Sequence, residues 1–370
     1  MDHKASSPVL YAAVTPHGYG HLAMTGAVLG ALTARRPDVS VVLETTLPEP
    51  IVRARVPGPL TVVAETEDFG LSMIDSTRID VEASAARYRA LHDDWDAVVA
   101  RAAARMAAHA PDLVLSNAGY IALAAAARLG VPSVVLAPLT WLHIYRHYFA
   151  DRPEAPGILA AMEAAYGSAR AVLVPDAAMP MDDLPNRIGI GPVGVPGRAR
   201  REEVCRALGL DEGARLALVT FGGVNSGLDL AAWPRGTGWH WLTRGGVAAD
   251  HPDAIDMDRV PALPFSDILA SVDAVVTKLG YGMTTECGFA GVPTLYLPRG
   301  DDWPEEPHLR AWLEGYAPLR AVDAARLRAG DIVDDLEALL RQPPPGPPAR
   351  PTGTEEGAAI VAGMFFGLKG

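Results

Sequence analysis

Short apolar runs alternate with longer segments of helical composition from one end of the chain to the other. The run Val9–Val14 (VLYAAV) is followed by a glycine-containing loop, an alanine- and leucine-rich segment at Leu22–Arg35, and a second apolar run at Val39–Glu44. Continuous apolar runs of this length are typical of strands that are buried on both faces of a parallel sheet. The alternation therefore predicts strand–helix–strand units of a doubly wound α/β protein.

The same alternation continues through the second half of the chain. Further predicted strands are Asp112–Ser116, Ser133–Leu136, Ala171–Val174, Leu216–Thr220, Trp239–Thr243, Ala274–Val276 and Thr294–Leu297. Further predicted helices are Ala83–Ala110, Ile121–Leu129, Glu202–Leu208, Asp267–Ala270, Met283–Ala290, Asp331–Arg341 and Glu355–Leu368. The Gly- and Pro-rich segment Asn186–Arg200 predicts an interdomain linker. We expect an N-terminal domain over residues 1–190, a C-terminal domain over 200–345, and a helix within 353–370 that packs back on the N-terminal domain.

Composition narrows the class of protein. A chain of 370 residues is long enough for two domains, and its net charge of −12 without a long basic run argues against a nucleic-acid partner. Its two cysteines, Cys205 and Cys287, lie far apart and form no CxxC motif, which disfavours a disulfide framework and favours a reducing cytoplasm. We also expect neither a signal peptide nor a transmembrane segment, because no apolar run of about 18 residues occurs without a charge or a breaker.

The segment Val275–Arg299 carries the strongest candidate chemistry. A predicted strand ends there in the glycine turn Lys278–Gly282, and a helix follows. Backbone N–H groups and the helix dipole make such a turn an anion site, and Thr284 and Thr285 add hydroxyl groups. Glu286 lies about one helical turn further in, where its carboxylate is suited to a ribose diol rather than to a phosphate. The alternative is a strand–glycine–helix turn without a ligand, since neither the GxGxxG nor the P-loop pattern is present.

The two ends of the chain together resemble a known fold family. The residues that carry the resemblance are His17-Gly18-Tyr19-Gly20-His21, Lys278-Leu279-Gly280-Tyr281-Gly282 with Glu286, and Leu295-Tyr296-Leu297-Pro298-Arg299, together with Asp80, Trp141, Ile144 and Tyr145. The chain is similar to GT-B-fold glycosyltransferases, in particular to the MurG-like group and to the glycosyltransferase-like domain that precedes the kinase in plant arabinokinases. No kinase domain follows in this sequence, so sugar-kinase activity is not expected.

The resemblance implies two Rossmann-like domains that face each other across a cleft, with the acceptor bound by the N-terminal domain and a nucleotide-diphosphate sugar, usually a UDP-sugar, bound by the C-terminal domain. It also implies that neither a metal nor another cofactor is needed, because a helix N-terminus stabilises the leaving diphosphate. The DxD pattern Asp256-Met257-Asp258 is therefore discounted as a metal site.

Site roles follow from the resemblance. His21 is the expected general base and His17 its alternative, although a helix-capping histidine would look the same in the sequence. Asn117 stands where many relatives carry an aspartate that stabilises the imidazolium. The expected donor-binding residues are Gly20, Gly222, Gly223, Phe265, Lys278, Gly280, Tyr281, Gly282, Met283, Thr284, Thr285, Glu286 and Asp302; the expected acceptor-binding residues are Asn117, Trp141 and Tyr145. Core packing is the alternative for Phe265, Trp141 and Tyr145, and a solvated turn for the acidic loop that contains Asp302, Glu305 and Glu306.

We therefore expect a metal-independent, inverting glycosyltransferase that moves a hexosyl or pentosyl group to a hydroxyl or amine of a small-molecule acceptor. A nucleotide-sugar epimerase of the same fold and a non-catalytic nucleotide-sugar-binding protein remain as alternatives. The sequence allows a homodimer, and it leaves open the acceptor, the donor sugar, the nucleobase and the stereochemistry.

Overall fold

A computed structural model of the chain describes residues 7–56, 58–222, 228–244, 251–257, 263–300 and 302–365. The chain divides into two compact units. Unit 1 comprises Met1–Ser72, Ile79–Gly194 and Thr352–Gly370, and unit 2 comprises Met73–Arg78 and Val195–Pro351. Each unit is built around one parallel sheet.

Unit 1 contains a seven-stranded sheet in the order β3-β2-β1-β4-β5-β6-β7. Its strands are β1 (Val9–Val14), β2 (Ser40–Glu44), β3 (Thr61–Val63), β4 (Leu113–Asn117), β5 (Ser133–Leu136), β6 (Ala171–Pro175) and β7 (Arg187–Ile190). β1 lies between β2 and β4, and Leu10 is in register with Val41 on one side and Leu113 on the other. Because all these pairings are parallel, the carboxyl ends of the strands meet at one edge of the sheet.

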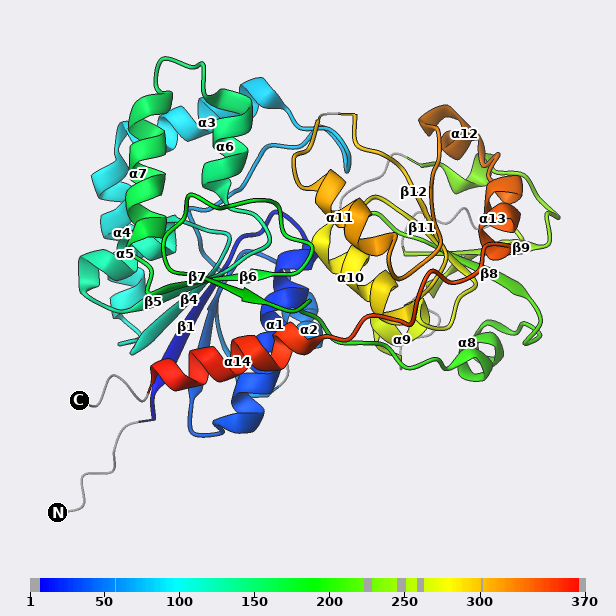
Figure 1. The fold of residues 1–370 in the computed structure, drawn as a ribbon, viewed down its shortest axis with the longest axis horizontal. Coiled ribbons are helices and arrows are strands. Elements are labelled where there is room, and N and C mark those ends of the chain that lie inside the picture. The colour runs from blue at the N-terminus through cyan, green and yellow to red at the C-terminus, as the bar shows by residue number, and fades with distance from the viewer. Residues whose placement is uncertain are drawn as a thin grey trace. The chain divides into compact units, whose positions relative to one another are not determined.

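The helices of unit 1 cover both faces of this sheet, with α1 and α14 on one face and α4, α5 and α7 on the other (Figure 1). They are α1 (Tyr19–Arg35), α2 (Glu49–Arg55), α3 (Val81–Asp93), α4 (Trp95–Ala107), α5 (Ile121–Leu129), α6 (Trp141–Phe149), α7 (Ala155–Gly167) and α14 (Thr352–Met364). The α/β doubly wound class predicted from the apolar runs is confirmed.

The single long helix predicted over Ala83–Ala110 is wrong. The structure divides it into α3 and α4 at Asp94, whose backbone (φ −131°, ψ 48°) is outside the helical region. Short acidic side chains bond to nearby backbone groups and disfavour helix interiors, and Asp93 and Asp94 stand together at this break. At the other end of α3, Asp80 caps the helix by accepting a hydrogen bond from the backbone N–H of Ala83.

The predicted linker Asn186–Arg200 is partly wrong as well. Its residues Arg187–Ile190 form β7, which pairs with β6 at the edge of the sheet. Three of the four β7 residues are exposed, so the strand lacks the continuous apolar run by which the buried strands were found. The boundary between the units falls later, between Gly194 and Val195.

Unit 2 contains a six-stranded parallel sheet in the order β10-β9-β8-β11-β12-β13, which repeats the order of the first six strands of unit 1. Its strands are β8 (Arg215–Val219), β9 (Trp239–Thr243), β10 (Ala254–Asp256), β11 (Ala274–Thr277), β12 (Thr294–Tyr296) and β13 (Leu319–Ala321). Its helices are α8 (Arg201–Leu208), the 3-10 helix η1 (Leu230–Ala232), α9 (Phe265–Leu269), α10 (Tyr281–Ala290), α11 (Glu306–Leu313), α12 (Ala324–Ala329) and α13 (Val333–Leu340). Three tryptophans, Trp233, Trp239 and Trp241, pack in its core with strand and α13 side chains.

The chain returns to unit 1 at its C-terminal end through α14, drawn in red beside the blue α1 in Figure 1. Gly353 approaches the chain so closely that an added Cβ would lie 1.8 Å from the carbonyl oxygen of Gly191. The hydroxyl of Thr354 donates to the carbonyl oxygen of Gly194 and accepts from the backbone N–H of the same residue. The last described helix is thus part of the first unit's fold.

Candidate functional site

The candidate catalytic residues lie where the winding of the unit 1 sheet reverses. β1 and β4 are neighbours in the sheet, and the connections that leave them run in opposite directions along it, to β2 and to β5. Open parallel sheets bind ligands at such a switch point, outside the carboxyl ends of the strands. His21 follows β1 in the first turn of α1, close to Gly20, and Asn117 is the last residue of β4.

His21 and Asn117 are in direct contact, with 2.7 Å between His21 Nδ1 and Asn117 Oδ1. The orientation of the Asn117 amide follows from its other neighbour. The Thr25 hydroxyl donates to the carbonyl oxygen of His21 at 2.9 Å, so its oxygen accepts from Asn117 Nδ2, also at 2.9 Å. The amide oxygen consequently faces the imidazole.

This network determines the tautomer of His21. Because an amide oxygen only accepts hydrogen bonds, Nδ1 of His21 carries the proton and Nε2 is the basic nitrogen. His17 has the opposite arrangement. Its Nδ1 accepts a long hydrogen bond (3.4 Å) from the backbone N–H of Leu71, which makes Nε2 the protonated nitrogen of the neutral ring.

The turn after Asn117 has a strained backbone. Ala118 adopts φ +61°, a left-handed conformation that is uncommon for a residue with a Cβ. Tyr166 donates its hydroxyl to the carbonyl of Ala118, and Ser116 donates to the carbonyl of Gly119 at 2.5 Å. Strain of this kind persists where surrounding contacts fix it, often at functional sites.

The rings predicted to contact an acceptor are inside the unit. Trp141 is 0% exposed and Tyr145 1% exposed, so neither forms an accessible wall in this conformation. Trp141 instead packs against the two candidate histidines, with ring centroids 5.1 Å from His17 and 6.2 Å from His21. Its edge also fills the space beside Gly70, where an added Cβ would lie 2.6 Å from the indole. Trp141 therefore packs against both candidate histidines, and Tyr145 packs on Tyr88.

Gly222 and the predicted donor residues from Lys278 to Glu286 follow β8 and β11, at the corresponding switch point of unit 2. Gly20, which was also predicted to bind the donor, belongs to α1 of unit 1. Gly222 follows β8 with φ +75°, and α10 follows β11 after a turn of three residues. α10 begins at Tyr281, two residues earlier than predicted, with Gly280 as its N-cap and without a side-chain cap. Lys278 Nζ lies beside this helix start, 3.4 Å from where a Cβ on Gly280 would be.

Most side chains in the first turns of α10 are buried, although the sequence predicts that they face a ligand. Tyr281 is 6% exposed and Glu286 7% exposed, so only a small part of the Glu286 side chain is accessible to a ribose. The Thr285 hydroxyl bonds to the backbone carbonyls of Tyr281 and Gly282, whereas the buried Thr284 Oγ1 has no hydrogen-bond partner among the described residues. Gly282 and Met283 are partly exposed.

One residue of the acidic loop after β12, Glu305, is buried rather than solvated. Glu305 is 4% exposed, its Oε2 accepts from the indole N–H of Trp303, and burial raises the pKa of its carboxyl while the nearby charges of Lys278 and Arg299 oppose that rise. Asp302 is exposed, with φ +54°. Phe265 begins α9 and is partly buried. Gly223 and Asp301 lie outside the described residues.

Sequence reasoning missed a carboxyl of unit 1, Asp68. It follows a short strand in a segment rich in acidic residues (AETEDFG, residues 64–70), and no periodic pattern distinguishes it from Glu65 or Glu67. Only the fold brings it to the same edge of the sheet as Thr15 and Gly119.

The described part of the chain contains neither a cluster of metal-binding side chains nor a membrane-spanning helix. No group of three or more His, Cys, Asp or Glu side chains there is arranged to hold a metal ion. None of the described helices combines the length and the apolarity that crossing a membrane requires.

No protein-family model matches the sequence. In the curated proteins, the chain is 29% identical over 313 residues to an L-arabinokinase of Arabidopsis thaliana; the match covers 82% of this chain and 29% of the relative. The chain thus spans less than a third of the length of that curated relative.

Solved structures match nearly the whole chain. The glycotransferase of kitacinnamycin superposes with a TM-score of 0.58 at 20% identity over 96% of this chain and 98% of that one. The calicheamicin glycosyltransferase CalG4 gives 0.60 at 17% identity over 98% of both chains. The chain has the GT-B fold. A further GT-B neighbour, Medicago truncatula UGT71G1 complexed with UDP-glucose, gives 0.54 at 12% identity over 98% of this chain and 95% of that one.

Proposed function

We propose that the protein is a glycosyltransferase that moves a sugar from a nucleotide-diphosphate donor to a hydroxyl or amine of a small-molecule acceptor. One observation carries the proposal: on a GT-B fold, His21 lies at the switch point of unit 1 with Nδ1 bound to Asn117 and Nε2 as its basic nitrogen. The resemblance of the turn before α10 to nucleotide-sugar sites supports a UDP-sugar as donor, and a relative solved with UDP-glucose has the same fold.

The proposed reaction is a single displacement that inverts the anomeric carbon. His21 Nε2 removes the proton of the acceptor as its oxygen or nitrogen attacks the anomeric carbon, and the bond from that carbon to the diphosphate breaks with both electrons on the departing nucleotide. His17 carries its proton on Nε2, which suits it to orient the acceptor rather than to act as the base.

In unit 2, the N-terminus of α10 would stabilise the charge that develops on the diphosphate. Its first N–H groups have no side-chain cap, and the Lys278 ammonium stands beside them. A helix dipole and a lysine together can replace a divalent cation at this position, so the proposed transfer is independent of metal. Glu286 would reach the ribose with only the exposed part of its side chain.

Asn117 favours a second candidate function, a non-catalytic nucleotide-sugar-binding protein. An amide orients the imidazole but adds no charge that stabilises the imidazolium. Binding of UDP-sugars without transfer to any member of an acceptor panel would support this second function and contradict the first.

Substitution of His21 tests the proposal directly. We expect His21→Ala to lower kcat by about 10²–10⁴-fold with UDP affinity unchanged, because the base acts only in the chemical step. His147→Ala, at an exposed histidine of α6, is the matched control and should retain activity. A His21→Ala enzyme within a few-fold of the parent would show that His21 is not the base.

A further inference from the structure

A small recess opens at the carboxyl edge of the unit 1 sheet, beside the candidate histidines. It is lined by the ends of β1 and β2, the segment after β3 and the start of α5: Ala13, Val14, Thr15, Glu44, Thr66, Asp68, Gly119, Ile121 and Ala122. The volume open to the centre of a water molecule is about 10 Å³, which is room for about one water-sized group. Asp68 links the recess to His17, because its Oδ1 accepts from the backbone N–H of Gly70 and the next residue, Leu71, donates to the imidazole.

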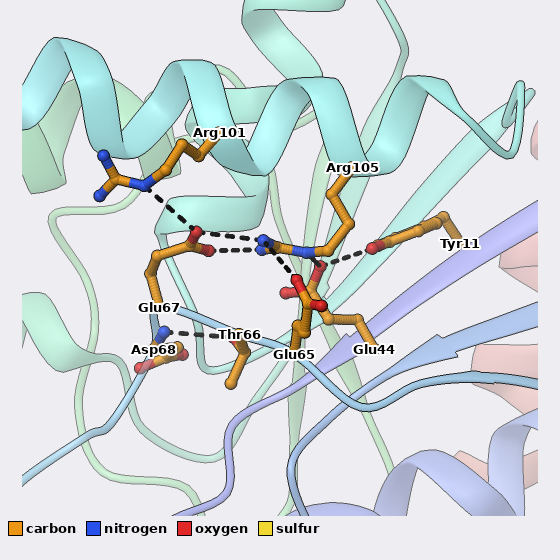
Figure 2. Close-up of polar contacts among 8 residues, drawn as sticks. All are labelled: Tyr11, Glu44, Glu65, Thr66, Glu67, Asp68, Arg101 and Arg105. Atoms are coloured by element: carbon orange, nitrogen blue, oxygen red, sulfur yellow. Dashed lines mark hydrogen bonds and ion pairs between the residues drawn. The ribbon is translucent and has the colours of Figure 1, made fainter.

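A buried ion-pair network holds the acidic wall of this recess in place (Figure 2). Arg105 of α4 donates from Nε to Glu44 Oε2 at 3.1 Å and forms a two-pronged pair with Glu67. Tyr11 donates to the same Glu44 oxygen at 2.5 Å. Because Arg105 ties the end of β2 to the segment after β3, the two carboxylates that line the recess, Glu44 and Asp68, cannot move apart freely.

Asp68 differs from its acidic neighbours because no cation accompanies it. Glu44 and Glu67 pair with Arg105, and Arg101 lies 4.0 Å from Glu67, whereas Asp68 forms no ion pair within the described part of the chain. Burial first, and then repulsion by Glu44, raise the pKa of Asp68 to about 7. Hydrogen bonds from the backbone N–H groups of Gly70 and Phe69 oppose this rise in pKa.

The other ionisable groups around Asp68 do not supply a charge. Tyr88 of α3, Tyr120 before α5 and Tyr166 of α7 all feel its field, and burial raises the pKa of each hydroxyl well above its usual value, so they are neutral near pH 7. The site therefore contains more negative than positive charge in its lining.

Two further features indicate that the recess is built to receive a ligand. Thr15 is 1% exposed and lines the recess, and its Oγ1 lacks a well-aligned hydrogen-bond partner, although it lies near enough to Asp68 to oppose the rise in pKa. Gly119 leaves space for the Asp68 carboxylate, since an added Cβ would lie 2.4 Å from Asp68 Oδ2. A buried hydroxyl without a well-aligned partner and a buried carboxyl without a cation both cost free energy unless a ligand satisfies them.

We propose that this recess is an acceptor subsite that binds a primary ammonium group, with Asp68, Glu44 and Thr15 accepting its three N–H bonds. The proposal rests on the proposed function, since it places an amine-bearing acceptor next to His17 and the His21–Asn117 pair. In this proposal Asp68 determines acceptor specificity, because it favours acceptors that carry an amine over acceptors that carry only hydroxyl groups.

An ammonium group fits the recess better than the other small polar groups. It has the size of a water molecule and only donates hydrogen bonds, and the polar side-chain atoms of the lining are carboxylate and hydroxyl oxygens that can all accept. Its positive charge also relieves the repulsion between Glu44 and Asp68. A neutral hydroxyl would leave that repulsion in place.

Carboxyl NMR of the full-length protein labelled with 13Cγ-aspartate tests the binding step. The Asp68 signal is assigned by its loss in Asp68→Asn, and its titration is followed in KCl, methylammonium chloride and tetramethylammonium chloride at equal ionic strength. Methylammonium should lower the apparent pKa of Asp68 by about one unit at about ten times its dissociation constant, since it binds the ionised form. Tetramethylammonium should leave it unchanged, because it has no N–H and is larger than the recess.

Three results would overturn the proposal. Equal shifts of the Asp68 pKa with both organic cations would indicate ionic screening alone. No shift with methylammonium would show that the recess does not bind amines. If K⁺ lowers the pKa relative to tetramethylammonium at least as much as methylammonium does, the recess is a site for a metal cation instead.

Variants separate the recess from the general charge of the region. Glu65→Gln removes a carboxylate from the same segment, with a side chain 77% exposed, and should retain the methylammonium effect. Thr15→Val should weaken it, and Gly119→Ala should abolish it by displacing the Asp68 carboxylate. Circular dichroism establishes whether each variant is folded. If Gly119→Ala does not fold, Thr15→Val alone tests whether the recess binds methylammonium.

A kinetic measurement connects the recess to transfer and keeps the two proposals distinguishable. With an amine-bearing acceptor found in a UDP-glucose turnover screen, Asp68→Asn should raise KM about tenfold or more and leave kcat within a few-fold, whereas KM for the N-acetylated acceptor should not change. UDP affinity should be the same in the parent and in Asp68→Asn. Absence of transfer with an intact methylammonium effect would contradict the proposed function alone, and transfer without amine preference would contradict only the subsite.

Discussion

At the scale of single residues, the Thr25 hydroxyl determines the tautomer of His21 through the amide of Asn117. Thr25 donates to a backbone carbonyl, and this leaves its oxygen to accept from the Asn117 amide, which in turn presents its oxygen to His21. The order of donors and acceptors along this chain of contacts places the His21 proton on Nδ1. His21 and Asn117 were both singled out in the sequence, but their contact and the tautomer depend on Thr25, which was not.

Replacement of Asn117 by aspartate tests the effect of the missing charge. In Asn117→Asp, a carboxylate 2.7 Å from Nδ1 would stabilise the imidazolium, so the base would stay protonated to higher pH. We expect the acid limb of the kcat/KM profile to move up by about one pH unit or more. The pH–rate profiles of the parent and Asn117→Asp provide the measurement, with Asn117→Ala as the control that removes the orienting contact; an unmoved limb would contradict a basic His21.

Asp68 should leave a signature in the pH dependence of stability. Its pKa is 3.8 in a model peptide and about 7 in the fold, so the folded protein binds its proton more tightly, and its contribution to stability is lost as pH rises from about 4 to about 7. Asp68→Asn removes this loss and should be more stable than the parent at pH 8 by about 1–3 kcal/mol, with little difference at pH 4. Urea unfolding at both pH values measures it, and a parent that is equally stable relative to Asp68→Asn at pH 4 and pH 8 would contradict the raised pKa.

At the scale of elements, close packing of helices in unit 2 depends on a glycine with an ordinary backbone. Gly288 of α10 faces α11, and an added Cβ would lie 2.5 Å from the indole of Trp312. Gly157, in the first turn of α7, has open space around its Cα instead. The two glycines have the same chemistry in the sequence and opposite packing in the fold.

The same substitution should therefore have opposite effects at these two positions. Gly288→Ala should lower the free energy of unfolding by about 1–3 kcal/mol because of overpacking, whereas Gly157→Ala should raise it by up to about 1 kcal/mol because alanine favours the helix. Chemical denaturation of both variants provides the comparison. A neutral Gly288→Ala would show that α11 can shift away from α10 without cost.

Elements were predictable where the strand or helix is buried on the expected faces. The apolar runs at β1, β5 and β9 gave the correct strands because these strands are inside the sheet. The sequence places β7 in a linker because it is a short exposed edge strand. It does not indicate the break between α3 and α4, because the alanine-rich pattern continues across it. Among the site residues, the sequence predicts that Trp141 and Tyr145 contact an acceptor, with core packing as the alternative, and both side chains are buried in the structure. Ring composition alone does not indicate in which direction a side chain points.

At the scale of the whole molecule, the order of segments along the chain differs from their division between the two units. α14 follows all of unit 2 in the chain but belongs to unit 1, where Ala358 and Val361 are fully buried. Unit 1 is thus completed by the last described element of the chain, and unit 2 is inserted between its parts.

Truncation after Pro351 should consequently destabilise the unit that is distant in sequence. We expect it to lower the stability of unit 1 by about 3 kcal/mol or more, because apolar surface of α1 and α14 is no longer buried, and to leave hydrogen exchange in β8 and β11 unchanged. Hydrogen–deuterium exchange with mass spectrometry provides the measurement. Glu355→Gln, which removes only an exposed ion pair with Arg35, is the control and should cost less than about 1 kcal/mol; loss of protection in unit 2 upon truncation would contradict this division.

The sequence by itself determined the fold class and the approximate positions of the two switch-point loops. Apolar periodicity and glycine placement are local properties, and parallel strands with short loops at their ends satisfy them in few ways. Tertiary structure alone decided which groups meet: the Asn117 amide at His21, the carboxylates of Glu44 and Asp68 around one recess, and α14 on α1. These contacts join residues that are distant along the chain, and burial, partner choice and proton position depend on that environment rather than on the residues' own types.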